Sequence, residues 1–310
     1  MTDLRTTVKL KQLGSHLGAE VTGVNLSAPL SKKTVNLLEA GMSKHKVLLF
    51  RGQRLSAESL AQFGSHFGEL QAHVQKRYQH AEVPEVVWMT NRNPDGSFDE
   101  VGAARGSALH TRDGWHSDMA FDPCPAKFTI LHALDIPSTG GNTCFANTEL
   151  VFRLLDQALQ ERLIGKQADF AYGGSATNDR NQLAANALSE ADKAASTAVH
   201  PVVSVHPETG IPAIFISPYT TCGIRDVSNI EQQTIYDTIY PIMDSQAVRW
   251  EHVWSVGDTI MWENRSGLMH SGRLDYPRDE ARTFIRTTVR GAPIAPYHPN
   301  RQVKREFGNS

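Results

Sequence analysis

Short runs of strand-forming residues, separated by turns rich in glycine, proline and asparagine, recur along this chain and restrict the folds open to it. The segment Lys127–Leu134 is one such run, and it ends before Pro137 and Gly140-Gly141. Others lie at 46–50, 83–90, 199–205, 213–217, 247–254, 258–263 and 282–290. Many short strands with such turns are typical of antiparallel sandwiches and jelly rolls. We therefore expect a mostly β fold with flanking helices.

Helical signals are fewer, and the clearest lie near the start of the chain. Ser31 is a candidate N-cap for a helix over about 32–45, and Ser56 is a candidate N-cap for a second helix that ends at Gly64. Two further helices are expected over 148–163 and 228–243. No glycine-rich phosphate-binding motif occurs in the sequence, so nucleotide-binding α/β folds have no support.

The length of 310 residues is compatible with one large domain, and the sequence contains no internal repeat. Residues 173–198 are rich in Gly, Ala, Asn and Ser and show little periodicity. A segment of that length without regular structure is usually functional or disordered. We expect a single domain over 1–310 with a lid or insertion near 173–198. Four tryptophans are expected to pack in the core: Trp88, Trp250, Trp254 and Trp262.

The composition argues against several classes of protein. A formal net charge of −2 provides no global basic field that would hold nucleic acid or an anionic membrane. The three cysteines (Cys124, Cys144 and Cys222) are widely spaced, which indicates free thiols in a reducing compartment. No apolar run approaches the roughly 20 residues that span a bilayer, and the N-terminus does not resemble a signal peptide. We expect a cytoplasmic protein.

The motif Trp115-His116-Ser117-Asp118 is the sharpest local feature. In an extended strand, residues i and i+2 project from the same face, so His116 and Asp118 could bind one metal ion. A His-x-acid tripeptide is weak evidence by itself, because it also occurs at 80–82 and 206–208. Context separates the three: the residues at 206–208 lie in a predicted turn and are expected to face solvent, whereas Asp118 leads into an apolar stretch.

The C-terminal part of the chain offers partners for this pair. His270 returns to apolar surroundings after a polar turn, and it is the candidate third ligand. Two histidines and one carboxylate with open coordination positions are diagnostic of non-haem Fe(II) oxygenases. Arg282 and Arg286 lie four residues apart and are expected on one face of a strand. Burying two guanidinium groups costs free energy unless they pair with anions. The planar guanidinium can form two parallel hydrogen bonds with a carboxylate, so a carboxylate is a suitable partner.

In these segments the sequence resembles the taurine dioxygenase / 2,4-dichlorophenoxyacetate dioxygenase (TauD/TfdA-like) family of Fe(II)/2-oxoglutarate-dependent dioxygenases. The similar segments are, in chain order, 17–26, 47–53, 67–70, 115–118, 140–143, 206–210 and 262–270, followed by Arg282 and Arg286. The resemblance implies a double-stranded β-helix (jelly-roll) core. It also implies Fe(II) bound by His116, Asp118 and His270, with 2-oxoglutarate and O₂ as cosubstrates.

The resemblance also implies roles for residues around the metal. Thr143 would hydrogen-bond 2-oxoglutarate, and Arg282 would pair with one of its carboxylates. His73 and Arg286 fall where the family holds the acidic group of its substrate. Arg112, a further candidate for substrate binding, replaces a small amide of the taurine enzyme, which argues against taurine itself. No catalytic residue is expected beyond the metal triad.

The implied reaction is hydroxylation of a small anionic substrate (a carboxylate, sulfonate or sulfate ester), with release of succinate and CO₂. A homodimer or homotetramer is the implied assembly. Two alternatives stay open. One is a metal-dependent jelly-roll enzyme of another class, such as a cupin-like isomerase or a zinc hydrolase, because a His/Asp/His set also suits zinc. The other is a non-catalytic ligand-binding sandwich. The first alternative does not need Thr143 or the two arginines, and the second would tolerate loss of His116 or Asp118.

Overall fold

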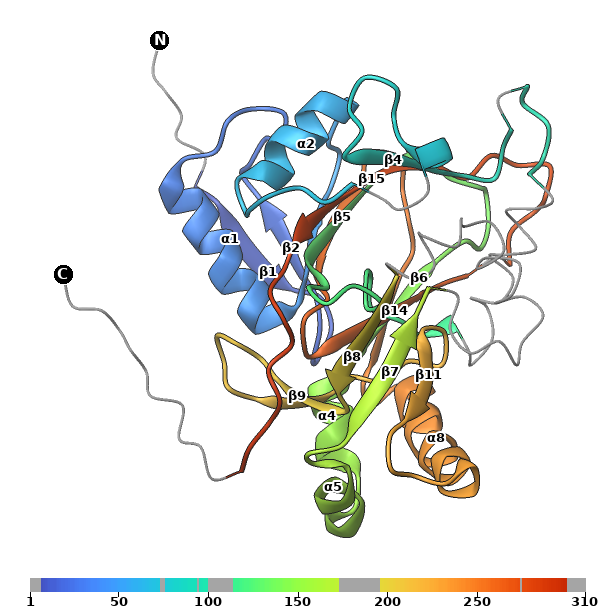
Figure 1. Ribbon diagram of the computed structural model, residues 1–310. Coiled ribbons are helices and arrows are strands. Elements are labelled where there is room, and N and C mark those ends of the chain that lie inside the picture. Colours follow the sequence, from blue (N-terminus) through green and yellow to red (C-terminus); the bar gives the residue numbers. More distant parts are fainter. Residues whose placement is uncertain are drawn as a thin grey trace.

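The largest unit of the protein is a seven-stranded sheet with the strand order β1-β2-β3-β13-β5-β15-β4 (Figure 1). The structure is a computed structural model that describes residues 7–72, 76–93, 95–99, 114–172, 196–273 and 275–299. The strands are β1 (Lys9–Gln12), β2 (Ala19–Thr22), β3 (Val47–Phe50), β13 (Thr259–Glu263), β5 (Ala126–Asp135), β15 (Thr283–Arg290) and β4 (Val86–Thr90). Strand β5 pairs antiparallel with both β13 and β15, so it lies inside the sheet.

Three smaller sheets complete the β structure. One has the order β12-β6-β14, the second β11-β7-β8, and the third pairs β10 with β9. Their bounds are β12 (Arg249–His252), β6 (Thr143–Asn147), β14 (Leu268–Gly272), β11 (Thr221–Ile224), β7 (Gln167–Ala171), β8 (Thr197–Pro201), β10 (Pro212–Ile214) and β9 (Val203–Val205). Phe145 of β6 and Leu268 of β14 share one buried cluster with Phe284 of β15, so the β12-β6-β14 sheet packs on the large one.

Strand β3 shows why the large sheet is covered on both faces. All four of its residues are buried. Val47 and Leu49 contact the cluster between the two sheets, whereas Leu48 and Phe50 contact the cluster under the first helices. Successive side chains of a strand point to opposite faces, so a strand with two covered faces must be continuously apolar. The run of apolar residues predicted as a buried strand is confirmed.

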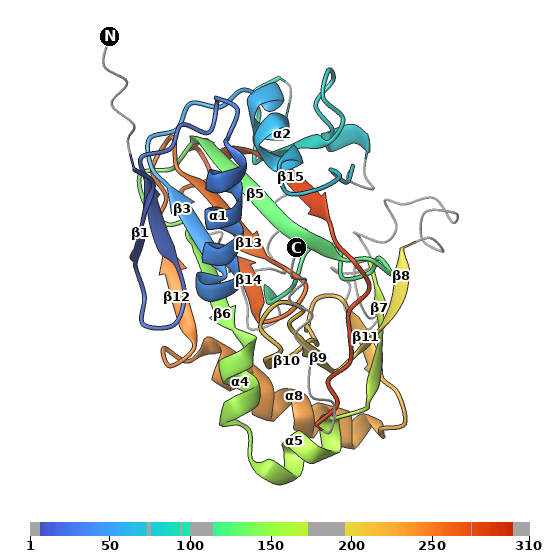
Figure 2. The same cartoon turned by 90° about the vertical axis from the view of Figure 1, so that its left-hand side faces the viewer.

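Helices α1 (Lys32–His45) and α2 (Ala57–Ser65) cover the outer face of the large sheet (Figures 1 and 2). Each begins where the sequence predicts. The Ser31 hydroxyl accepts from the Thr34 amide, and Ser56 forms a reciprocal capping box with Ser59. These caps satisfy backbone donors that a helix start leaves free.

The predicted helix over 148–163 is two helices, α4 (Thr148–Leu154) and α5 (Gln157–Leu163). The break occurs because the Asp156 side chain accepts from the Leu159 amide at 2.8 Å and starts a new helix. The predicted helix over 228–243 corresponds to α8 (Asn229–Asp244), which Ser228 caps.

Most of the expected lid, residues 173–195, lies outside the described residues. Its last two positions, 197 and 198, open strand β8. Among the helices of the described segments, none combines the length and apolar character needed to cross a membrane.

Candidate metal and anion site

Two histidines that are distant in the sequence share one backbone bridge. His270 lies on β14, and His116 pairs with it as an isolated antiparallel bridge. Each backbone N–H donates to the carbonyl of the other residue, at 3.0 and 2.9 Å. The bridge holds the two imidazole rings with their centroids 4.1 Å apart. Backbone pairing therefore brings the two candidate ligands together.

Asp118 lies where the chain turns away from this bridge. Met119 follows it with φ of 58°, a left-handed conformation that is uncommon for residues other than glycine. The segment is thus a bridge followed by a turn, not the regular strand that the spacing predicts. The turn still places the carboxylate beside the imidazoles. One ligand atom from each of His116, Asp118 and His270 lies within 4.8 Å of the other two.

The charge states of the three groups suit a cation. Burial alone would raise the pKa of the Asp118 carboxyl, but the Arg286 guanidinium and the two imidazoles hold it well below its usual range. Burial, with a smaller contribution from the neighbouring His116, lowers the pKa of His270 to about 3. Burial also lowers the pKa of His116. At neutral pH the set is therefore two neutral imidazoles and one carboxylate.

This donor set fits a divalent transition metal. The Nδ1 atom of His116 lies 2.8 Å from the Gly114 carbonyl, so Nδ1 carries the hydrogen and Nε2 keeps its lone pair. The Nδ1 atom of His270 is buried and has no hydrogen-bond partner among the residues that the structure describes. A buried imidazole nitrogen without a partner is costly unless a ligand or ion satisfies it.

Arg282 immediately precedes β15 and carries a half-buried positive charge. Its guanidinium lies over the Phe284 ring at 4.4 Å, and it donates twice to the Gly141 carbonyl, at 3.1 and 2.9 Å. Burial lowers its pKa to about 10, so it remains protonated at neutral pH. Within the described segments no carboxylate forms an ion pair with it. A half-buried guanidinium without a paired carboxylate in these segments is a suitable partner for an anion.

Gly141 makes this arrangement possible. Its φ is +69°, which a side chain would strain, and an added Cβ would lie 3.0 Å from the Arg282 Nε atom. The double glycine of the sequence therefore allows the guanidinium to approach the backbone closely.

Thr143 begins β6 and contacts a residue whose role the sequence does not indicate. Its hydroxyl oxygen accepts from the Trp254 indole N–H at 3.0 Å, which leaves the hydroxyl hydrogen free to donate elsewhere. Trp254 packs edge-on against Phe284, with ring centroids 4.8 Å apart. Trp254 is buried as predicted, whereas the same prediction is wrong for Trp88, which is 37% exposed. Trp254 also joins Thr143 to the aromatic ring that supports Arg282. No local pattern separates this tryptophan from the others.

Tyr219 is a second residue that the sequence does not single out. Its ring lies 5.4 Å from that of His116, and burial raises the pKa of its hydroxyl. It lies between β10 and β11, just after the strand that the sequence predicts over 213–217.

The remaining candidates divide into two groups. Arg286 is paired with a candidate metal ligand: its Nη1 atom lies 3.0 Å from an Asp118 oxygen. Its Nε atom is buried and without a hydrogen-bond partner in the described part of the chain. His73 and Arg112, the other substrate candidates, lie outside the described residues.

A second cluster with metal-ligand chemistry consists of His206, Glu208 and Glu263. The prediction that His206 faces solvent is wrong, because its side chain is 0% exposed. Arg265 donates to both carboxylates, with contacts of 2.7 Å to Glu263 and 2.9 Å to Glu208. This guanidinium already pairs with both carboxylates and offsets one of their two charges, so the cluster is best described as a largely buried ion-pair network.

Replacing Glu263 by glutamine tests this network. Burial alone would raise the pKa of Glu263, but Arg265 outweighs burial and the pKa falls to about 2, from 4.5. The stabilisation that the ionised Glu263 provides is therefore fully present above about pH 4.5, and it is lost as the pH falls toward 2. We expect Glu263→Gln to lower the unfolding free energy at pH 7 by about 3 kcal/mol, because Arg265 loses its buried partner.

Urea denaturation between pH 7 and pH 3 measures this difference. The matched control is Glu231→Gln, which removes a surface ion pair with Arg162 and should change stability by less than about 1 kcal/mol. Equal stability of wild type and Glu263→Gln at pH 7 would show that the network contributes nothing.

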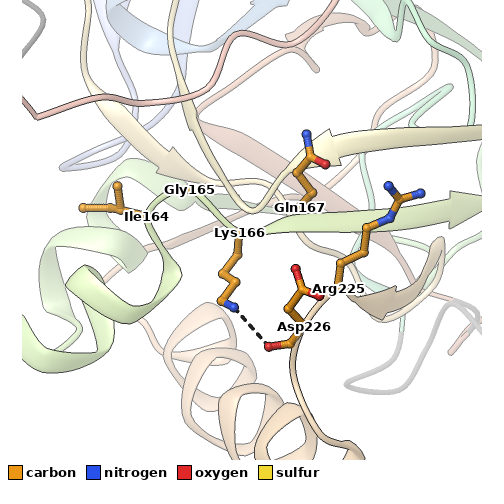
Figure 3. A pocket seen from close by; sticks show the side chains of 6 residues that line it. All are labelled: Ile164, Gly165, Lys166, Gln167, Arg225 and Asp226. Carbon is orange, nitrogen blue, oxygen red and sulfur yellow. Dashed lines mark hydrogen bonds between the residues drawn. The ribbon is translucent and has the colours of Figure 1, made fainter.

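A hollow of about 680 Å³ lies elsewhere, around the start of β7 (Figure 3). It is lined by Ile164, Gly165, Lys166, Gln167, Arg225 and Asp226. Its two basic residues are engaged: Lys166 donates to the Asp226 carbonyl, and Arg225 pairs with Asp169 at 2.6 Å. None of the residues of the metal and anion site lines it, so it does not enter the chemistry proposed below.

Comparison with known proteins agrees with this geometry. Residues 9–288 match the family described as taurine catabolism dioxygenase TauD, TfdA family. An alkylsulfatase of Acinetobacter baylyi is 29% identical over 293 residues, which cover 92% of this chain and 85% of that protein. The alpha-ketoglutarate-dependent 2,4-dichlorophenoxyacetate dioxygenase of Cupriavidus pinatubonensis is 28% identical and covers 87% of this chain and 93% of its own length.

Solved structures share the fold. The structure of AAD-2 in complex with Mn(II) and N-oxalylglycine superposes with a TM-score of 0.78 at 24% identity, covering 96% of this chain and all of that one. This likeness confirms the predicted jelly-roll core with flanking helices. Because the family match spans almost the whole of the described sandwich, the chain belongs to the TauD/TfdA family of dioxygenases.

Proposed function

We propose that this protein is an Fe(II)- and 2-oxoglutarate-dependent dioxygenase that hydroxylates a small anionic substrate and releases succinate and CO₂. One observation carries the proposal: the same sandwich holds a His/Asp/His donor set and a half-buried arginine that has no carboxylate partner among the described residues. The family and the names of its relatives support the same reaction class.

His116, Asp118 and His270 would bind the iron and leave coordination positions open. When bound, Fe(II) supplies the activation of O₂ that accompanies oxidative decarboxylation of 2-oxoglutarate. The protein supplies binding and orientation. Arg282 would bind a carboxylate of 2-oxoglutarate with its planar fork, and the Thr143 hydroxyl would donate its free hydrogen to the same molecule.

The anionic group of the substrate would be bound by Arg286, with His73 and Arg112 as further candidates. The buried Nε atom of Arg286 retains a donor for an oxyanion. The names of two relatives refer to a sulfate ester and to a carboxylate substrate. They support a substrate with an oxyanion group but do not distinguish sulfate from carboxylate. A single domain over 1–310, a lid near 173–198, a cytoplasmic location and a homodimer or homotetramer also remain proposals.

A zinc hydrolase or a cupin-like isomerase would use the same three ligands, but it would give no role to Arg282 or to the oriented hydroxyl of Thr143. A non-catalytic ligand-binding sandwich would give no role to the metal ligands His116 and Asp118. No contact in the described residues favours either alternative over the dioxygenase.

Anaerobic loading tests the proposal. Wild-type protein mixed with Fe(II) and 2-oxoglutarate should develop the weak visible absorption band of the iron chelate, and replacing Fe(II) by Zn(II) should give none. Air should then produce succinate, faster in the presence of the correct alkyl sulfate, sulfonate or aryloxyacetate. Protein that binds Fe(II) but gives neither the band nor succinate with any compound would refute the dioxygenase and favour another metal-dependent enzyme.

A further inference from the structure

Asp118, Thr129 and Asn264 form a closed ring of hydrogen bonds next to the candidate metal ligands. The Asp118 amide donates to the Asn264 Oδ1 atom at 3.0 Å. The Asn264 Nδ2 atom donates to the Thr129 hydroxyl at 2.9 Å, and that hydroxyl donates to the Asp118 Oδ2 atom at 2.6 Å. Asn264 and Thr129 are 0% exposed, so water does not compete for these bonds.

Chemistry fixes the direction of every bond in this ring. A backbone N–H can only donate, so the atom of Asn264 that meets the Asp118 amide must be the carbonyl oxygen. The other end of the Asn264 side chain is then the NH₂ group, which can only donate to Thr129. The single hydroxyl hydrogen of Thr129 is left for the Asp118 carboxylate. No other assignment satisfies all three residues.

Asp118 needs such support because regular structure does not hold it. His270 lies in strand β14 and His116 in a backbone bridge, whereas Asp118 opens a turn whose next residue, Met119, has a positive φ. The ring replaces strand pairing by bonding both the backbone and the carboxylate of Asp118.

The turn that carries Asn264 is itself held from the other side. The Glu263 carboxylate accepts from the backbone amides of Asn264 and Arg265, at 3.2 and 2.9 Å, and from the Arg265 guanidinium. The buried ion-pair network described above thus fixes the backbone on each side of Asn264, while the Asn264 side chain is directed to Thr129 and Asp118.

We propose that Asn264 and Thr129 are positioning residues that orient the Asp118 carboxylate for metal binding, with the Glu263–Arg265 pair as the support of Asn264. The proposal rests on the proposed function, because it assumes that Asp118 is a metal ligand. Residues that orient a ligand in this way commonly change metal affinity by about 10- to 100-fold when they are removed.

Titration of metal-free protein with Mn(II), followed by the electron paramagnetic resonance signal of free Mn(II), measures the affinity without turnover. Thr129→Val preserves shape but removes the hydroxyl, and we expect the Kd for Mn(II) to rise about 10- to 100-fold. Thr129→Ser keeps the hydroxyl and should restore the Kd to within about threefold of wild type. Thr129→Cys, with a weaker donor, should lie between the two.

The matched control is Thr287→Val. Thr287 is also buried and lies on the neighbouring strand β15, but its hydroxyl donates to the Glu85 carbonyl and not to the site. This variant should bind Mn(II) as wild type does. A Kd for Thr129→Val within twofold of wild type, in a folded protein, would overturn the positioning role and leave the dioxygenase intact. Wild-type protein without Mn(II) binding would instead overturn the metal site itself.

Discussion

Asp118→Asn is expected to abolish succinate formation and to weaken Fe(II) or Mn(II) binding by at least about 100-fold. Asp118 is the only anionic member of the proposed ligand set, and the variant keeps its shape while removing its charge. Loss of the charge also leaves Arg286 without its buried partner. A metal site of two neutral imidazoles beside an uncompensated guanidinium repels a divalent cation, so both the binding and the reaction fail together.

The stability of Asp118→Asn must be measured together with its activity. Removing one partner of a buried ion pair typically costs about 3–5 kcal/mol, so Asp118→Asn should unfold at lower urea concentration than wild type. Metal binding is therefore compared at a temperature where both proteins are folded, as judged by circular dichroism. Asp156→Asn is the matched control: it makes the same change at the N-cap of α5, where asparagine caps as well as aspartate. Wild-type metal affinity in folded Asp118→Asn would remove Asp118 from the ligand set.

Features that depend on neighbouring residues are predictable from the sequence. The serine caps of α1 and α2 and the doubly buried strand β3 are set by a few adjacent side chains, and the structure has them where the sequence predicts them. The single helix predicted over 148–163 fails for an equally local reason, the cap at Asp156.

Features that depend on tertiary contacts are not predictable in this way. The His-x-acid motif at 206–208 has the composition of an exposed turn, but Arg265 from a distant strand end pairs with its carboxylate, and His206 is buried against Glu263. Trp254 similarly acquires its contact with Thr143 only when β12 pairs with β6. The ring of Asp118, Thr129 and Asn264 joins three separate segments, and no spacing in the sequence indicates it.

Arg282 and Arg286 lie four residues apart in the sequence but have different surroundings in the structure. Substitutions of the two are therefore expected to have different effects. Arg282 touches the Gly141 carbonyl and the Phe284 ring but none of the metal ligands. Arg286 bonds Asp118 directly. We expect Arg282→Gln to raise the KM for 2-oxoglutarate by at least about 100-fold, since losing a charged, forked hydrogen bond of about 3 kcal/mol corresponds to that factor. Its Mn(II) affinity should remain that of wild type.

Two further variants test these roles. Arg282→Lys distinguishes the charge of Arg282 from its planar geometry, and Arg286→Gln distinguishes binding of the substrate from binding of the cosubstrate. Lysine keeps the positive charge but lacks the planar fork, so the KM for 2-oxoglutarate should rise by an intermediate factor of about ten. Arg286→Gln should instead change Mn(II) affinity, because it frees the Asp118 carboxylate, and should raise the KM of the anionic substrate. Steady-state succinate assays and Mn(II) titration measure both variants. If Arg282→Gln left the KM for 2-oxoglutarate unchanged, the Arg282 guanidinium would have a structural role alone, and the residue that binds the cosubstrate would have to be sought at Arg286.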